Sequence, residues 1–138
     1  MADLTFLDHT GDIGFDLQAI TLIDLFDRAA KGLYEIMIER MPAPGEGVAM
    51  IEISEKAPDL LLRSFLSELL YRFLAHREIL VHFSQFSIGN GRLTARASTA
   101  RFDPKRDGLR TELKAVTYHQ LDVRRKDVLW KARVIFDV

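Results

Sequence analysis

The sequence has 138 residues, which suits one domain, and a hydrophobic content of 48%, which is enough for a sizeable core. It has no cysteine, which excludes disulfides, thiolate metal sites and a cysteine nucleophile and fits a reducing cytoplasm. No apolar, uncharged run reaches roughly 18 residues, and the N-terminus does not resemble a secretory signal. We therefore expect a cytoplasmic protein with no membrane association.

The net charge of −1 hides an uneven distribution along the chain. Residues 1–60 carry a net charge of −8, whereas residues 61–138 carry a net charge of +7. This asymmetry could create one acidic and one basic surface, but folding could also interleave the halves and cancel most of the field. We favour interleaving, because mixed charges are the usual state of a protein surface.

The first half of the chain predicts two strands, a helix and a third strand. Residues 2–7 and 13–19 alternate apolar and polar side chains and flank an acidic turn. From Thr21, a typical N-cap residue, apolar side chains recur at spacings of three and four, which predicts a helix that ends near Arg40 before a proline-rich segment. A strand at residues 48–53 follows.

The second half predicts another helix and then only strands. Pro58 suits the first turn of a helix whose broad apolar stripe must be buried. Asn90-Gly91 predicts a tight hairpin turn and not a phosphate-binding loop, because the glycines lead into a strand instead of a helix. Residues 102–108 read as a loop, and residues 112–123 and 128–136 as a final hairpin through the segment RRKD.

These elements predict an α+β fold. We expect a single domain over residues 1–138, with a mostly antiparallel sheet and two amphipathic helices packed on one face.

The acidic turn DHTGD leaves three interpretations open. Its carboxylates suit Ca²⁺ or Mg²⁺, and His9 could add a nitrogen ligand for a softer ion. Two carboxylates could instead form a general acid/base pair if burial separates their pKa values. The plainest interpretation is that Asp8 and Asp12 accept hydrogen bonds from backbone amides within a turn.

The end of the sequence strengthens the cation interpretation. The segment VIFDV keeps a strand pattern to its last residue, so Asp137 and the α-carboxylate of Val138 place oxygen ligands at one strand end. If that end lies beside the first loop, Asp12, Asp137 and Val138 form an anionic pocket that a cation would neutralise.

Other candidate chemistry is weakly supported. The sequence has no recognisable serine-nucleophile motif, and His76 and His82 have no partner at ligand spacing, so we treat them as surface or packing residues. Thr117 and His119 are expected in the middle of a strand, on one face, with Tyr118 on the other.

Three segments together resemble the archease family. They are DHTGDIGF near the start, TELKAVTYH at residues 111–119 and VIFDV at the end, and the two helical segments also resemble those of the family in the same order. One position departs from the family motif: Gly11 stands where alanine is usual, which keeps every ligand but loosens the backbone before Asp12.

The resemblance implies a small α+β protein that is not itself an enzyme. Archeases are accessory factors of the RtcB-type tRNA-splicing RNA ligase, whose guanylylation and turnover they promote, and tRNA would be an indirect partner. The resemblance also implies a divalent cation, calcium or a similar ion, held where the chain termini join. By motif position, its ligands are Asp12, Asp137 and Val138.

Two alternatives stay open. A metal-dependent phosphoester hydrolase would use Asp12, Asp137 and His9 around a water molecule, but it would need an open metal position and a base. An RNA-binding or chaperone-like modulator of RNA-modifying enzymes would use the basic strands and loop of the second half. The residues of that basic segment are Arg92, Arg96, Arg101, Lys105, Arg106 and Arg110.

Overall fold

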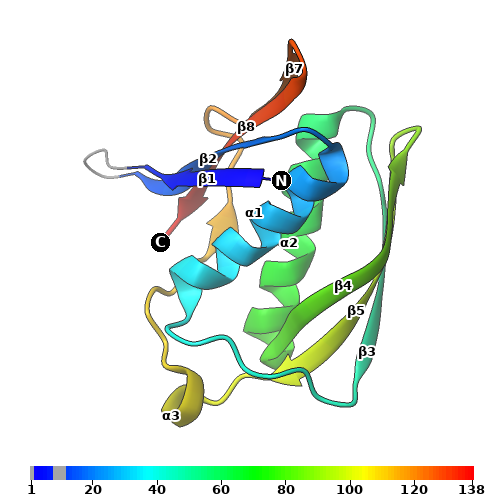
Figure 1. Ribbon diagram of the computed structural model, residues 1–138. Helices are drawn as coiled ribbons and strands as arrows, with labels where there is room; N and C mark the ends of the chain where they lie inside the picture. Colours follow the sequence, from blue (N-terminus) through cyan, green and yellow to red (C-terminus); the bar gives the residue numbers. More distant parts are fainter. Residues whose placement is uncertain (1, 8–11) are drawn as a thin grey trace.

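Two antiparallel sheets lie on either side of a pair of long helices in the computed structural model, which describes residues 2–7 and 12–138 (Figure 1). The helices are α1 (Leu22–Met37), α2 (Pro58–His76) and the short α3 (Pro104–Asp107). The strands are β1 (Ala2–Phe6), β2 (Ile13–Ala19), β3 (Val48–Ser54), β4 (Glu78–Gly89), β5 (Arg92–Arg101), β6 (Ala115–Val116), β7 (Asp122–Lys126) and β8 (Leu129–Asp137). The α+β class and the mostly antiparallel pairing are therefore as predicted.

The larger sheet is built around β8. Strand β2 pairs with one edge of β8 and β1 pairs with β2, while β6 and β7 pair with the other edge of β8, β6 near its end and β7 near its start. In the smaller sheet, β5 is central between β3 and β4. The larger sheet thus places β2 beside β8, the last strand, and this pairing sets the position of the candidate site.

The strands divide between two sheets, whereas a single sheet with both helices on one face was expected. The two long helices contact strands of both sheets. The reason lies in the wide apolar surface of α2, where neighbouring pairs such as Leu61–Leu62, Phe65–Leu66 and Leu69–Leu70 are all buried. An apolar surface of that width has to pack against other elements on more than one side of the helix to be buried.

Aromatic side chains join these layers. Phe65 of α2 lies 5.9 Å from Phe26 of α1 and 5.5 and 5.6 Å from Phe83 and Phe86 of β4, measured between ring centroids. In the larger sheet, Phe15 packs edge to face on Phe136 at 5.4 Å. One hydrophobic core therefore links both sheets to both helices.

Helix α1 is fixed at both ends by polar contacts. The hydroxyl of Thr21 accepts a hydrogen bond from the backbone N–H of Asp24 at 3.1 Å, as the N-cap prediction required. Near the other end, the buried hydroxyl of Tyr34 accepts from the backbone N–H of Leu80 at 3.1 Å, which ties the helix to β4. Burial raises the pKa of Tyr34 far above its ordinary value, so this phenol stays neutral.

The hairpin at Asn90-Gly91 is confirmed, with positive φ angles of 53° and 72°. The predicted loop at 102–108 instead contains α3. Pro104 occupies the first turn of this helix, and the side chain of Asp103 accepts from the backbone N–H of Lys105 at 3.0 Å.

The strand predicted over residues 112–123 was wrong outside β6 and the start of β7, because residues 112–114 and 117–121 are not in a strand. It is interrupted after β6, because Thr117 Oγ1 donates to the carbonyl of Ile135 at 2.9 Å and accepts from the backbone N–H of His119 at 3.1 Å. These bonds turn the chain, so Thr117 and His119 do not lie in the middle of a strand. The final hairpin turns at residues 127–128, because Lys126 pairs with Leu129, and not through the whole of RRKD.

Within the described ranges, no helix has both the length and the apolar character needed to cross a bilayer.

Candidate metal centre

Asp12 and Asp137 lie at the same end of the β2–β8 strand pair. The antiparallel register pairs Ile13 with Phe136, so the residue before Ile13 and the residue after Phe136 are neighbours across the two strands. Figure 1 shows the start of β2 and the end of β8 at one end of the larger sheet. The adjacency on which the cation prediction depended is therefore present; metal binding itself stays a prediction.

Backbone contacts hold Asp137 on its other side. Asp137 is paired with Ala115 of β6, and its carbonyl oxygen accepts from the backbone N–H of Lys114 at 2.8 Å. The last strand position is consequently flanked by chain on both edges. These contacts fix the backbone of Asp137, which is one of the candidate ligands.

Gly14 permits a close approach of the two strands beside this point. A Cβ atom at Gly14 would clash with the carbonyl oxygen of Val134. Only glycine avoids this overlap without moving the β8 backbone, so Gly14 keeps the two strands close next to the candidate site.

Asp12 faces away from the helices, on the outer side of the larger sheet. Alternate residues of β2, namely Phe15, Leu17 and Ala19, are buried against the core, whereas Asp16 and Gln18 are half-buried on the other face. Asp12 is an even number of residues from Asp16 and Gln18, so strand alternation places it on the same face as these two residues. The candidate site therefore continues the polar outer face of this sheet.

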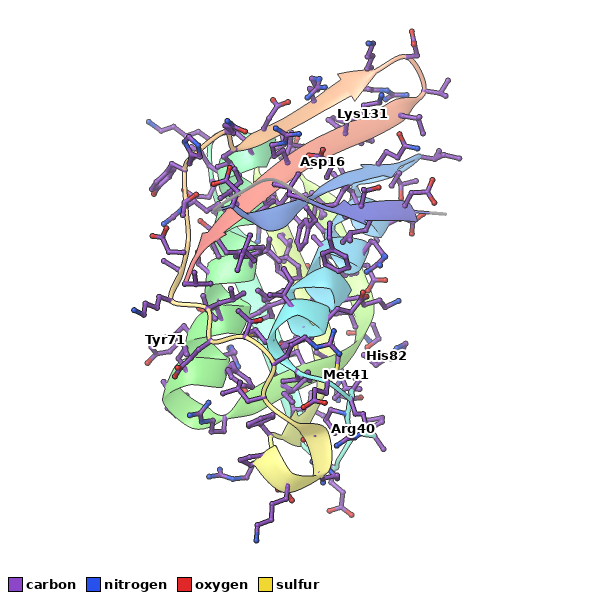
Figure 2. The ribbon with its side chains drawn as sticks, turned by 90° about the vertical axis from the view of Figure 1, so that its left-hand side faces the viewer. Asp16, Arg40, Met41, Tyr71, His82 and Lys131 are labelled. Carbon is purple, nitrogen blue, oxygen red and sulfur yellow. The ribbon has the colours of Figure 1, made fainter. Side chains whose placement is uncertain are left out.

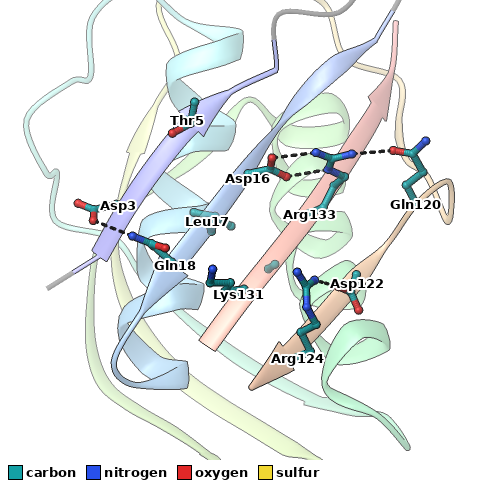
Figure 3. Close-up of a pocket in the computed structure, with 11 residues that line it drawn as sticks. Asp3, Thr5, Asp16, Leu17, Gln18, Gln120, Asp122, Arg124, Lys131 and Arg133 are labelled. Carbon is teal, nitrogen blue, oxygen red and sulfur yellow. Dashed lines mark hydrogen bonds and ion pairs between the residues drawn. The ribbon is translucent and has the colours of Figure 1, made fainter. Parts of the chain in front are cut away.

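That outer face carries a hollow of about 700 Å³ (Figure 3). Its charged and amide lining residues are Asp3, Asp16, Gln18, Gln120, Asp122, Arg124, Lys131 and Arg133. Figure 3 shows that most of these charges are paired within the hollow: Gln18 donates to Asp3, and Arg124 pairs with Asp122.

The strongest of these pairs joins β2 to β8. Arg133 donates through Nε and Nη2 to the two carboxylate oxygens of Asp16, at 2.7 and 2.9 Å, and through Nη1 to Gln120 Oε1 at 2.9 Å. The Asp16 hydrogen bonds raise the pKa of Arg133, and the negative charge of Asp12 adds to the effect. Arg133 is thus a cation whose charge interacts with that of Asp12, and it is already engaged by Asp16.

The residues present fit a hard divalent cation. Asp12 and Asp137 bring two carboxylates to one strand end, neither forms an ion pair with a side chain of the described residues, and main-chain oxygens of Val138 are adjacent. Among the described residues, no group of three or more acidic, histidine or cysteine side chains could hold a metal ion. A full ligand set therefore needs Val138 as well as the two carboxylates.

Four residues of the acidic motif, Asp8, His9, Thr10 and Gly11, lie outside the described residues. The amino end of β1 does not meet the C-terminal strand end, because Ala2 pairs with Ala19 at the opposite end of β2. The two termini are therefore not joined as expected. The candidate site lies instead where the segment entering β2 meets the end of β8.

The remaining predicted candidates lie elsewhere. His76 ends α2, and His82 lies exposed on β4. In the basic segment, Arg92 pairs with Glu52 at 2.8 Å and Arg106 pairs with Asp107 at 2.8 Å. Part of the charge proposed for RNA binding is thus neutralised within the chain.

Sequence reasoning missed the Asp16–Arg133 pair and the role of Gly14. A signal for the pair did exist. Extending the expected meeting of Asp12 and Asp137 into an antiparallel register places Asp16 opposite Arg133, as observed.

Comparison with known proteins identifies the family of the chain. The model of the Archease protein family (MTH1598/TM1083) matches residues 5–138. Protein archease from Methanosarcina barkeri is 37% identical, with 96% of this chain and 94% of that protein covered. Protein archease from Pyrococcus furiosus is 32% identical, with 95% of each chain covered.

Solved structures share the fold. The solution structure of protein 1598 from Methanobacterium thermoautotrophicum has a TM-score of 0.77 at 28% identity and 98% coverage of both chains. The crystal structure of TM1083 from Thermotoga maritima, described as an archease and possible chaperone, has a TM-score of 0.67 at 17% identity, covering 97% of this chain and 96% of that one. The second likeness concerns the fold alone. From the family match over nearly its whole length and the identity to these relatives, the chain belongs to the archease family.

Proposed function

We propose that this protein is an accessory factor that activates an RtcB-type tRNA-splicing RNA ligase by promoting its guanylylation and turnover. The observation that carries the proposal is the register of β2 and β8, which makes Asp12 and Asp137 neighbours in a chain of the archease family. The catalytic groups belong to the ligase. The accessory protein contributes a positioned set of oxygen ligands.

In this proposal, Asp12, Asp137 and the main-chain oxygens of Val138 hold a divalent cation, with Ca²⁺ as the first candidate. A bound divalent cation would supply positive charge that can neutralise phosphate oxygens during guanylyl transfer. The chain's own task is to orient the ligands. Pairing with Ala115 holds Asp137, and the bidentate bond to Asp16 fixes the position of the Arg133 guanidinium.

The position of the site suits presentation to a partner. Asp137 is exposed, and Asp12 lies on the sheet face that the helices leave uncovered. A cation there would be reachable by a nucleotide bound to another protein. We infer that the chain presents the ion at the surface and does not enclose it.

The test is single-turnover guanylylation of a purified RtcB-type ligase, with and without this protein. We expect Asp12→Ala to abolish the stimulation, since one of two carboxylates is lost. The matched control is Asp3→Ala, an acid on the same sheet face toward the opposite end of β2. Unchanged stimulation by a folded Asp12→Ala protein would refute the proposal, as would equal losses in both variants.

A further inference from the structure

A second hollow in the surface of the molecule lies beside α2, away from the candidate metal centre's sheet face. A groove of about 480 Å³ runs between the outer side of α2 and the segment that contains β6. Its lining residues are Arg63, Ser67, Leu70, Tyr71, Leu74, Ala75, Lys114, Ala115 and Val116. No carboxylate side chain is among these described lining residues, although the chain as a whole is slightly acidic.

The groove contains a pre-oriented arginine. The Nε atom of Arg63 donates to the carbonyl oxygen of Val116 at 3.0 Å, and its guanidinium lies 3.7 Å from the ring centroid of Tyr118. These contacts fix the plane of the guanidinium, while its two terminal nitrogens form no hydrogen bond within the described residues. Arg63 is therefore poised to bind a carboxylate from outside at little cost in side-chain entropy.

The apolar part of the groove lies on the C-terminal half of α2. Tyr71 is 58% exposed and Leu74 is 43% exposed, although both belong to a helix whose other faces are packed. Figure 2 shows Tyr71 projecting from the outer side of the molecule. An exposed tyrosine beside a fixed arginine matches the composition of protein-interface hot spots, and Leu74 extends the exposed apolar surface next to them.

We propose that this groove is the docking site for an acidic segment of the partner ligase, a segment that carries an apolar side chain beside a carboxylate. The proposal rests on the proposed function, because it names where that partner is held. Arg63 and Lys114 would bind the carboxylate of this segment. Tyr71 and Leu74 would pack against its apolar side chain. The pairing of Ala115 with Asp137 places one wall of the groove next to the candidate metal centre.

The observations favour a protein segment over single-stranded RNA. One face of the Tyr118 ring is already covered by Arg63, and the Tyr71 ring packs edge-on against His76 at 5.9 Å. The rest of the apolar lining is aliphatic, and two cations, Arg63 and Lys114, are among the described residues that border it. RNA binding instead requires open aromatic faces and a series of phosphate contacts.

The first experiment measures the affinity of the full chain for a purified RtcB-type ligase by calorimetry. We expect Leu74→Glu and Lys114→Glu each to weaken binding by about tenfold or more, because each places a negative charge against the acidic segment. The matched controls are Val128→Glu, at an exposed apolar position in the β7–β8 turn, and Lys56→Glu, at an exposed lysine outside the groove. Circular dichroism and thermal unfolding establish that all four variants fold.

A second experiment identifies the docked segment. Because the chain has no cysteine, Ala75→Cys creates a single attachment point in the groove for a photo-crosslinker. Ser87→Cys, exposed on β4, is the control. We expect Ala75→Cys to crosslink to an acidic segment of the ligase, and the peptide to be found by mass spectrometry.

The outcomes separate this proposal from the proposed function. If the wild-type protein stimulates guanylylation but Leu74→Glu and Lys114→Glu bind like their controls, the groove proposal is overturned and the function stands. A crosslink to a basic segment, or loss of binding to a single-stranded oligoribonucleotide instead of the ligase, also overturns it. A wild-type protein that neither binds nor stimulates the ligase overturns both.

Discussion

At the scale of single residues, Asp107 is unusual because it is a charged side chain with only 1% of its surface exposed. Its Oδ2 accepts from the backbone N–H of Asp103 at 2.9 Å and from Arg106 Nη2 at 3.0 Å, and its Oδ1 accepts from Arg106 Nε at 2.8 Å. The Arg106 hydrogen bonds hold the pKa of Asp107 below its usual value. This carboxylate therefore closes the single turn of α3.

We expect Asp107→Asn to lower the free energy of unfolding at pH 7 by about 1 kcal/mol, because an ion pair with a largely exposed arginine is lost while the shape is kept. Since folding lowers the pKa of Asp107, its contribution is full above the pKa of the unfolded chain and is lost as the pH falls through the folded-state pKa. Urea unfolding at pH 7 and near pH 3 checks this. The difference between the two proteins should be smaller at the lower pH.

The control for this prediction is Asp122→Asn, which removes an exposed ion pair with Arg124. It should change the free energy of unfolding by less than about 0.5 kcal/mol. If the free energies of unfolding of wild type and Asp107→Asn differed by the same amount at both pH values, the loss of the Asp107 charge would not be the cause of the destabilisation.

The residues of the candidate site could be predicted only in part. Asp137 and Val138 were identifiable because a strand pattern runs to the last residue, and Asp12 because the archease motif places it. The ligand role of all three stays a prediction. The Asp16–Arg133 pair joins residues 117 positions apart, and such a contact follows from strand register, which local patterns do not determine.

At the scale of elements, the pairing of β2 with β8 depends on Gly14. We expect Gly14→Ala to lower the free energy of unfolding by about 1–3 kcal/mol, because the new methyl group would overlap the Val134 carbonyl and force the strands apart. The same displacement should weaken Ca²⁺ binding at the adjacent strand end. Chemical denaturation and calcium calorimetry measure the two effects.

Gly89→Ala is the matched control, because a Cβ at Gly89 meets nothing within 4 Å. It should leave both measurements nearly unchanged. If the two alanine variants behaved alike, the close approach at Gly14 would not be what holds the strand pair together.

Elements with strong local signals were predictable, and those fixed by tertiary contacts were not. Helix α1 followed from apolar periodicity and a Thr21 cap, and the hairpin from Asn90-Gly91. The segment TELKAVTYH looks like a strand because its side chains alternate, yet it forms only β6. Its chain direction is set by the bonds of Thr117 to Ile135 and His119, which involve a distant strand.

At the scale of the whole molecule, folding interleaves the acidic first half and the basic second half. Arg133 pairs with Asp16, and Arg92 pairs with Glu52, so cations of the second half lie beside acids of the first. An excess of positive or negative charge therefore persists only on small parts of the described surface and not over a whole face of the molecule. The groove with Arg63 and Lys114 and the strand end with Asp12 and Asp137 are two such places, and β6 connects them.

This arrangement makes the candidate metal centre a link between β2 and β8, the last strand, so a bound ion should stabilise the whole fold. A ligand that binds only the native state at 100 times its Kd adds about 2.7 kcal/mol to the free energy of unfolding. We expect Ca²⁺ at that excess to raise the melting temperature of the wild-type protein by several degrees, measured by calorimetry. Asp12→Asn and Asp137→Asn should each abolish most of the rise, whereas Asp3→Asn, at the opposite end of β2, should retain it. An equal rise in all three variants would place calcium elsewhere on the molecule and would remove the physical basis for a cation presented by the meeting of β2 and β8.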